Sequence, residues 1–182
     1  MKNMFPEIKK NFGFGFMRLP MIADQVDIQQ TKEMVDAFLN AGFNYFDTAH
    51  GYIDGKSEKA IGACLSARYP RNAFILANKL SDWYFEKEED IVPLFESQLE
   101  ICGVEYFDFY LMHALSADRH RMFSEAQAYD IAQQLKAEGK LRHVGMSFHD
   151  SAEVLDQILT DRPELEFVQL QFNYADYNDP KV

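Results

Sequence analysis

The sequence has 182 residues, of which 47% are hydrophobic and 14% aromatic, enough for one domain with a substantial core. Its 29 acidic and 18 basic residues leave a formal net charge of -11, and such a surface repels phosphate backbones. Nucleic acid is therefore excluded as a partner. The sequence contains no basic amphipathic segment and no apolar run of transmembrane length, so we expect no membrane binding.

The N-terminal segment and the cysteines indicate the cellular location of the protein. Residues 1–10 lack the apolar core of a signal peptide. Cys64 and Cys102 lie far apart in segments with a helical pattern, where a reduced, packed thiol is the usual state. The sequence therefore predicts a cytoplasmic protein.

The first third of the chain alternates expected strands and helices. In F-G-F-G-F-M-R-L-P, residues 12–20, glycine alternates with aromatic residues, which predicts a short hairpin or a close approach to another surface. Asp27 with Gln30 predicts a capping box at the start of a helix that stops at Gly42. The apolar run at residues 43–48 then predicts a strand, and a second helix is expected over residues 58–68.

The same alternation continues to the end of the chain. A strand is expected at residues 73–77, ending at Asn78-Lys79, then a helix stopped by Gly103 and a third strand at residues 106–112, ending at His113. The remaining predicted elements are a helix from Ser124 and Gln127 to Gly139, a strand at 143–147, a helix capped by Ser151 and a fifth strand at 167–174.

Apolar strands that alternate with helices predict a parallel sheet covered by helices, either doubly wound or closed as a (β/α)8 barrel. A doubly wound nucleotide-binding fold should have glycines in its first strand-to-helix turn, but here that turn holds Asp47, Tyr52 and Ser57. The barrel is therefore favoured. Because eight units need roughly 250 residues, we expect an α/β fold of the (β/α)8 TIM-barrel type, truncated after its fifth strand. Residues 1–182 would form a single domain, incomplete at the C-terminus.

Four polar residues lie where a β/α barrel carries its chemistry, at the carboxyl ends of strands. Asp47 ends the first expected strand, Tyr52 lies in the loop that follows, Lys79 ends the second strand and His113 the third. Each residue alone is weak evidence, since a loop tyrosine is usually packing and a lone histidine is more often a satisfied core residue. Their joint placement on three successive strand ends predicts a catalytic site.

The four residues can act together as a general acid, Tyr52, and three groups that assist its proton transfer. A phenol donates its proton poorly near neutral pH unless a neighbouring cation stabilises the phenolate. Lys79 would supply that cation, Asp47 would hold the ammonium in place, and His113 would donate a hydrogen bond to a substrate oxygen. An acid that protonates a carbonyl oxygen requires something to attack the carbonyl carbon, and without a serine or cysteine nucleophile set an external hydride is the economical answer.

At this point the sequence resembles the aldo-keto reductases, NADPH-dependent (β/α)8 barrels. The matching segments cover nearly the whole chain: G-F-G-F-M-R-L-P from Gly13, F-D-T-A-H-G-Y-x-x-G-x-S-E from Phe46, Lys79, L-M-H from Leu111, G-K-L-R-H-V-G-M-S from Gly139, and V-Q-L-Q-F-N-Y from Val168. The resemblance implies a catalytic tetrad of Asp47, Tyr52, Lys79 and His113.

The resemblance also implies a cofactor, NADPH with NADH as the alternative, and a small carbonyl substrate. Ser147 and Gln169 match the family residues that contact the nicotinamide carboxamide, and Asp47 is also expected at the cofactor. Phe148 stands where the family often has asparagine, a departure that bears on one cofactor hydrogen bond. In the family, the residues that stack on the nicotinamide and bind the phosphates belong to later strands, which this sequence does not contain.

Other readings remain open. Lys79 could instead form a Schiff base, as in barrel aldolases, or the chain could be a regulatory or truncated reductase-fold module without activity. An incomplete sheet would expose the edge of its last strand, which favours self-association. His50, His120, His143 and His149 have neither helical ligand spacing nor cysteine partners, so we expect no metal site.

Overall fold

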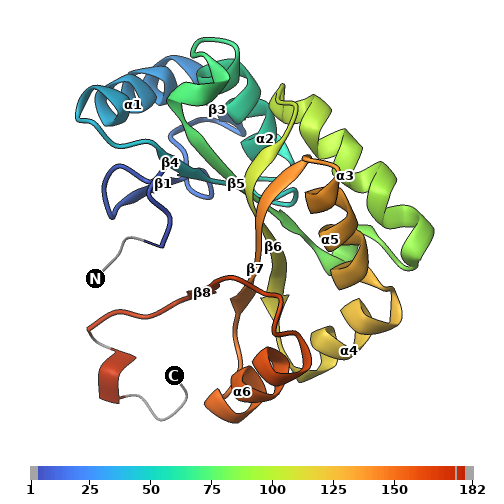
Figure 1. The fold of residues 1–182 in the computed structure, drawn as a ribbon. Helices are drawn as coiled ribbons and strands as arrows, with labels where there is room; N and C mark the ends of the chain where they lie inside the picture. The colour runs from blue at the N-terminus through green and yellow to red at the C-terminus, as the bar shows by residue number, and fades with distance from the viewer. Residues whose placement is uncertain (1–3, 175, 179–182) are drawn as a thin grey trace.

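The computed structural model describes residues 4–174 and 176–178 (Figure 1). Its main sheet has six parallel strands in the order β1-β4-β5-β6-β7-β8. They are β1 (Gly13–Gly15), β4 (Tyr45–Asp47), β5 (Ile75–Leu80), β6 (Phe107–Leu115), β7 (Leu141–Phe148) and β8 (Val168–Leu170). Spatial order follows chain order, whereas a doubly wound sheet reverses direction at a switch point. The sheet is therefore a curled half-barrel, as predicted.

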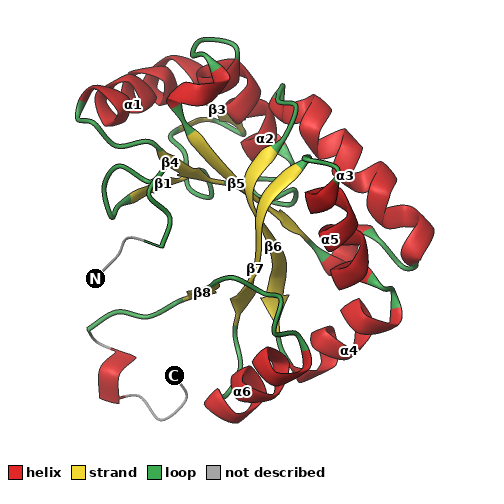
Figure 2. Cartoon of the chain, in the orientation of Figure 1, coloured by secondary structure: helices red, strands yellow, loops and turns green. Residues whose placement is uncertain are grey.

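The helices lie along the outer face of this curled sheet (Figure 2). They are α1 (Ile28–Asn40), α2 (Lys56–Ile61), α3 (Glu88–Cys102), α4 (Ala117–Glu125), α5 (Ala128–Ala137) and α6 (Ala152–Asp161), and α2 continues as a π-helical turn, Gly62–Ser66. Short 3-10 turns occupy Arg71–Ala73, Asp82–Tyr84 and Asp176–Asn178.

Side chains of each strand divide between two apolar layers, because successive strand residues point to opposite faces. The larger layer fills the space between sheet and helices and includes Phe46, Leu76, Tyr110 and Met146. A smaller cluster of Ile75, Ala77, Phe109 and Leu111 lies on the inner face, with Phe5, Ile8, Tyr45 and Phe167 packed against it. The N-terminal residues thus cover part of the barrel interior.

The predicted helix boundaries are largely confirmed. The Asp27 carboxylate caps α1 by accepting a hydrogen bond from Gln30 N at 2.9 Å, and the Ser151 hydroxyl caps α6. The second half of the predicted capping box is not formed, because Asp27 N donates to the backbone oxygen of Pro20 and not to the Gln30 side chain. Helices end before Gly42, Gly103 and Gly139, which have φ of 83°, 64° and 80°, a region that favours glycine.

The prediction for residues 12–20 was only half right. Gly13–Gly15 do approach another surface closely, since a Cβ on Gly13 would lie 2.9 Å from the Tyr45 ring. However, they form a sixth strand, parallel to β4, and not a hairpin. The hairpin follows instead, where β2 (Met21–Ile22) pairs antiparallel with β3 (Gln25–Val26).

Three further boundaries were wrong. The third predicted strand does not end at His113, because β6 continues through His113 to Leu115. Ser124 does not open a helix: it lies inside α4, which is capped by Ser116, and α5 begins after Gln127. Helix α4 was missed because its sequence is highly charged and only Phe123 is buried, so its hydrophobic pattern is weak. The fifth predicted strand, at 167–174, shortens to Val168–Leu170 because β8 pairs on one side only among the described residues.

A buried carboxylate fixes the amino end of the sheet. Asp108 on β6 is fully buried, and its oxygens accept hydrogen bonds from Arg71 at 2.6 Å, Arg142 at 2.8 Å and Leu76 N at 2.9 Å. Both guanidinium groups also lie over the ring of Tyr106. Because a buried charge requires partners, this cluster holds β5, β6 and β7 in register.

Among the described residues, no helix combines the length and the apolar character needed to cross a membrane. Cys64 and Cys102 are free thiols and both are buried, as their patterns predicted.

Candidate active site

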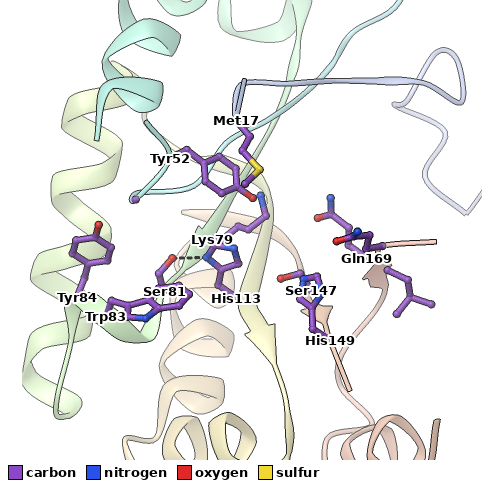
Figure 3. Close-up of a pocket in the computed structure, with 13 residues that line it drawn as sticks. Met17, Tyr52, Lys79, Ser81, Trp83, Tyr84, His113, Ser147, His149 and Gln169 are labelled. Atoms are coloured by element: carbon purple, nitrogen blue, oxygen red, sulfur yellow. Dashed lines mark hydrogen bonds between the residues drawn. The ribbon is translucent and has the colours of Figure 1, made fainter. Parts of the chain in front are cut away.

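The register of the parallel strands brings the predicted residues to one end of the sheet. Leu80 on β5 pairs with Met112 on β6. The residues that follow them on the two strands, Ser81 and His113, therefore lie side by side. Asp47 is the last residue of β4, and Tyr52 lies in the loop beyond it. Figure 3 shows Tyr52, Lys79 and His113 pointing toward one another.

Lys79 is the most enclosed member of the set, with only 1% of its surface exposed. Its Nζ donates hydrogen bonds to Asp47 Oδ1 at 2.7 Å and to the backbone oxygen of Thr48 at 2.8 Å. A buried ammonium needs such acceptors, since an unpaired charge in the interior is strongly unfavourable. The sequence-based pairing of Lys79 with Asp47 is therefore present.

Tyr52 lies on the other side of this ammonium. Lys79 Nζ is 4.8 Å from the centroid of the Tyr52 ring, and that ring meets the His113 ring edge-on at a centroid distance of 5.8 Å. The loop after Tyr52 is tightly wound, with φ of 53° at Ile53 and 52° at Asp54. Non-glycine residues rarely adopt this conformation, and such strain clusters at functional sites.

A β-bulge carries His113. The β6–β7 register runs from Met112 opposite Met146 to Leu115 opposite Phe148, so His113 and Ala114 together face one residue, Ser147. Ala114 has a φ of 55°, and its amide donates a 2.7 Å hydrogen bond to the Ser147 hydroxyl. Bulges re-aim side chains beside active sites, and this one links His113 to a predicted cofactor residue.

The surroundings of His113 keep its imidazole neutral. Burial, followed by the positive charges of Lys79 and Arg119, lowers the pKa of His113 from 6.5 to about 3. His113 Nδ1 lies 2.6 Å from the Ser81 hydroxyl, and the Trp83 ring approaches the His113 ring edge-on at 5.7 Å. A neutral imidazole has one N–H, so the histidine can donate a hydrogen bond without carrying charge.

This depressed pKa predicts a pH dependence of stability. The unfolded state binds a proton at His113 below pH 6.5, whereas the folded state does so only near pH 3, so the free energy of unfolding decreases as pH falls through this window. The contribution is up to about 1.4 kcal/mol for each pH unit. We expect His113→Asn to lose less stability than the wild type between pH 7 and pH 4 in urea unfolding. Parallel stability curves for the two proteins would contradict this expectation.

A cavity of about 520 Å³ opens between these side chains. Tyr52, Lys79 and His113 line it together with both residues predicted to contact nicotinamide, Ser147 and Gln169. Asp47 lines the neighbouring cavity on the inner face of the sheet, which Gln169 also borders. The structure therefore brings all six predicted site residues around two adjoining cavities.

Further residues of the wall were not predicted from the sequence, among them Met17, Ser81, Trp83, Tyr84 and His149. Ser81 had a signal, because residues two apart on a strand share a face and Lys79 was already placed there. Trp83 and Tyr84 lie in a 3-10 turn after β5 and gave none.

The turn that bears Trp83 is anchored by Arg119 of α4. Its guanidinium donates hydrogen bonds to Asp82 Oδ2 and to the backbone oxygen of Ala114, both at 2.9 Å, and lies 4.8 Å from the Trp83 ring. One side chain thus joins the turn to the bulge that carries His113.

The residues also fit a cofactor with hydroxyl and amide groups. Asp47 Oδ2 is buried and has no hydrogen-bond partner among the described residues, and the Gln169 side chain is exposed. Ser147 accepts from Ala114 N, so its own hydroxyl proton is free to donate. Phe148, which replaces the asparagine common in the family, packs into the apolar layer between sheet and helices.

Comparisons with known proteins place the sequence in a family. The model of the Aldo/keto reductase family matches residues 11–181. An aldo-keto reductase from Mycolicibacterium smegmatis is 27% identical over 146 residues, which cover 79% of this chain and 50% of the relative. The NADH-specific methylglyoxal reductase of Escherichia coli is 28% identical over 163 residues, covering 78% of this chain and 48% of the relative.

Solved structures show the same likeness. A Klebsiella pneumoniae aldo-keto reductase in complex with NADPH superposes with a TM-score of 0.71 at 25% identity, over 92% of this chain and 57% of the other. This chain spans about half the length of the curated relatives it matches. With the family model covering residues 11–181, the chain belongs to the aldo/keto reductase family.

Proposed function

We propose that this chain carries the catalytic half of an NADPH-dependent carbonyl reductase, which converts an aldehyde or ketone to an alcohol. The observation that carries the proposal is the convergence of Tyr52, Lys79 and His113 on one cavity, with Asp47 paired to Lys79. These residues come from three successive strand ends, the usual place for catalysis in a β/α barrel.

In this mechanism Tyr52 is the general acid that protonates the carbonyl oxygen. The Lys79 ammonium, next to the Tyr52 ring, stabilises the phenolate that remains after proton transfer. Asp47 and the Thr48 carbonyl keep the ammonium in position. Neutral His113 donates a hydrogen bond to the same carbonyl oxygen and orients the substrate.

The cofactor would supply the hydride that the carbonyl carbon accepts. Ser147 and Gln169 would bind its carboxamide, and Asp47 Oδ2 would accept a hydrogen bond from one of its hydroxyl groups. The Klebsiella pneumoniae structure was solved with NADPH, whereas one relative is named as NADH-specific, so NADPH is the proposed cofactor and NADH the alternative. Relatives named as methylglyoxal reductases support a small carbonyl substrate.

A fluorescence titration of the 182-residue chain with NADPH tests the proposal first. We expect micromolar binding, weakened in Gln169→Ala, followed by aldehyde-dependent consumption of NADPH. A chain that is folded by circular dichroism, but neither binds NADPH nor consumes it, would contradict the proposal.

The Schiff-base reading of Lys79 has less support. A nucleophilic amine must present a lone pair to the substrate, whereas Lys79 Nζ donates to two oxygens. Borohydride trapping of a carbonyl compound on Lys79 would be the evidence for it.

The open edge of the sheet supports the alternative of a non-catalytic or self-associating module. Leu170 and Phe172 are 52% and 58% exposed beside β8, and exposed strand edges favour pairing with another chain. Sedimentation as a single monomeric species would argue against self-association. The free, buried cysteines support the proposed cytoplasmic location, where thiols stay reduced.

A further inference from the structure

We propose that Ser81 is a positioning residue that fixes the tautomer of His113, leaving the Nε2 proton free to bind a substrate oxygen. The inference rests on the proposed function for its catalytic consequence, but the tautomer itself can be tested without any reaction. Its basis is the contact drawn in Figure 3, in which the Ser81 hydroxyl meets His113 Nδ1 at 2.6 Å.

The fold places Ser81 next to the imidazole of His113. Ser81 comes two residues after Lys79 on the same face, and the β5–β6 register sets it beside His113. It is 1% exposed, and its backbone oxygen accepts a hydrogen bond from Tyr84 N at 3.2 Å. Because the turn at Asp82–Tyr84 follows directly, the serine is held by both the strand and the turn.

Only one direction of this hydrogen bond satisfies both the hydroxyl and the ring nitrogen. Within the described part of the chain, the Ser81 hydroxyl has no acceptor other than His113 Nδ1. If Nδ1 carried the proton and donated it to the serine, the buried hydroxyl proton would have no partner, which is unfavourable. The hydroxyl is therefore the donor, Nδ1 the acceptor, and the single proton of the neutral ring lies on Nε2.

The environment of the His113 ring keeps the imidazole neutral. The charged and titratable groups around His113 are Tyr52 in the loop after β4, Lys79 on β5, Arg119 on α4 and His149 after β7. None of them is an anion that would favour a second proton on the imidazole. Nε2 has no hydrogen-bond partner among the described residues, so its proton is available to a carbonyl oxygen in the cavity.

Nitrogen NMR of the chain with 15N-labelled histidine tests this assignment directly. The chain has five histidines, and the His113 signals are identified by their loss in His113→Asn. We expect the Nε2–H tautomer, with an Nδ1 resonance shifted by an accepted hydrogen bond, unchanged between about pH 5 and pH 8. In Ser81→Ala the Nδ1 resonance should move toward its unbonded position and the Nδ1–H tautomer should become populated. Ser81→Thr, which keeps the hydroxyl, should resemble the wild type.

Two results would overturn the proposal: an Nδ1–H tautomer in the wild type, or His113 signals that do not change in Ser81→Ala. The wild-type spectrum decides even where a variant fails to fold. In the reductase assay, Ser81→Ala should lower kcat about tenfold, the effect of one lost hydrogen bond, and Ser81→Thr should restore it. If the wild type shows the expected spectrum but no reductase activity, the proposed function fails and the role of Ser81 in setting the tautomer stands.

Discussion

Tyr52→Phe is expected to lower kcat for carbonyl reduction by about 10²- to 10⁴-fold, the usual range for removal of a general acid. The substitution removes only the phenol oxygen, and the ring keeps its contacts with Lys79 and His113. The fold and the NADPH dissociation constant should therefore stay the same. Steady-state kinetics with an aldehyde, together with an NADPH titration, separate the loss of chemistry from a loss of binding.

A matched control removes a phenol oxygen elsewhere. Tyr174 is 96% exposed and does not line either cavity of the site, so Tyr174→Phe should leave kcat unchanged. If Tyr52→Phe retains full activity, Tyr52 is not the acid, and the mechanism proposed for this site is wrong.

Asp108→Asn is expected to lower the free energy of unfolding by about 3–5 kcal/mol, the range for breaking a buried ion pair. The carboxylate is fully buried and bonded to two guanidinium groups. Asparagine has the same shape but no charge, so Arg71, whose side chain is only 19% exposed, would lose its counter-ion. Urea unfolding followed by circular dichroism measures the change.

The control for this second prediction is a carboxylate at the surface. Asp118 pairs with Arg121 at 3.0 Å, and their side chains are 87% and 70% exposed. Surface pairs contribute about 0–1 kcal/mol, so Asp118→Asn should have little effect. A similar, small loss for both variants would mean that the Asp108 cluster does not hold the sheet together.

The fold class could be predicted because the central strands are nearly uniform apolar runs. Residues 106–112 have the apolar pattern of a buried strand, and Phe107–Met112 are all buried, including the polar Asp108. Residues 13–15 could not be predicted as a strand, since alternating glycine gives no apolar period and only pairing with β4 makes them one. That one domain spans residues 1–182 stays a prediction.

The candidate site was likewise predictable in part: the residues at strand ends could be placed from the sequence, and the residues that contact them from other elements could not. Asp47, Lys79 and His113 end apolar runs, so their common location was predictable from the rule for strand ends. Trp83 and Arg119 were not, because their contact joins a turn after β5 to helix α4, 36 residues later. Sequence patterns report local periodicity and carry no information on such pairings.

The strand order described above also bears on how the protein is made. Each strand of the main sheet after β1 pairs with one that was synthesised before it, so from β4 onward every new strand finds a partner that already exists. A ribosome adds about 5–20 residues per second, which is slow compared with the local folding of a helix or the closure of a short loop. The sheet can therefore grow strand by strand as the chain emerges, and β4 and β5, which carry Asp47 and Lys79, are both synthesised before β6, which carries His113.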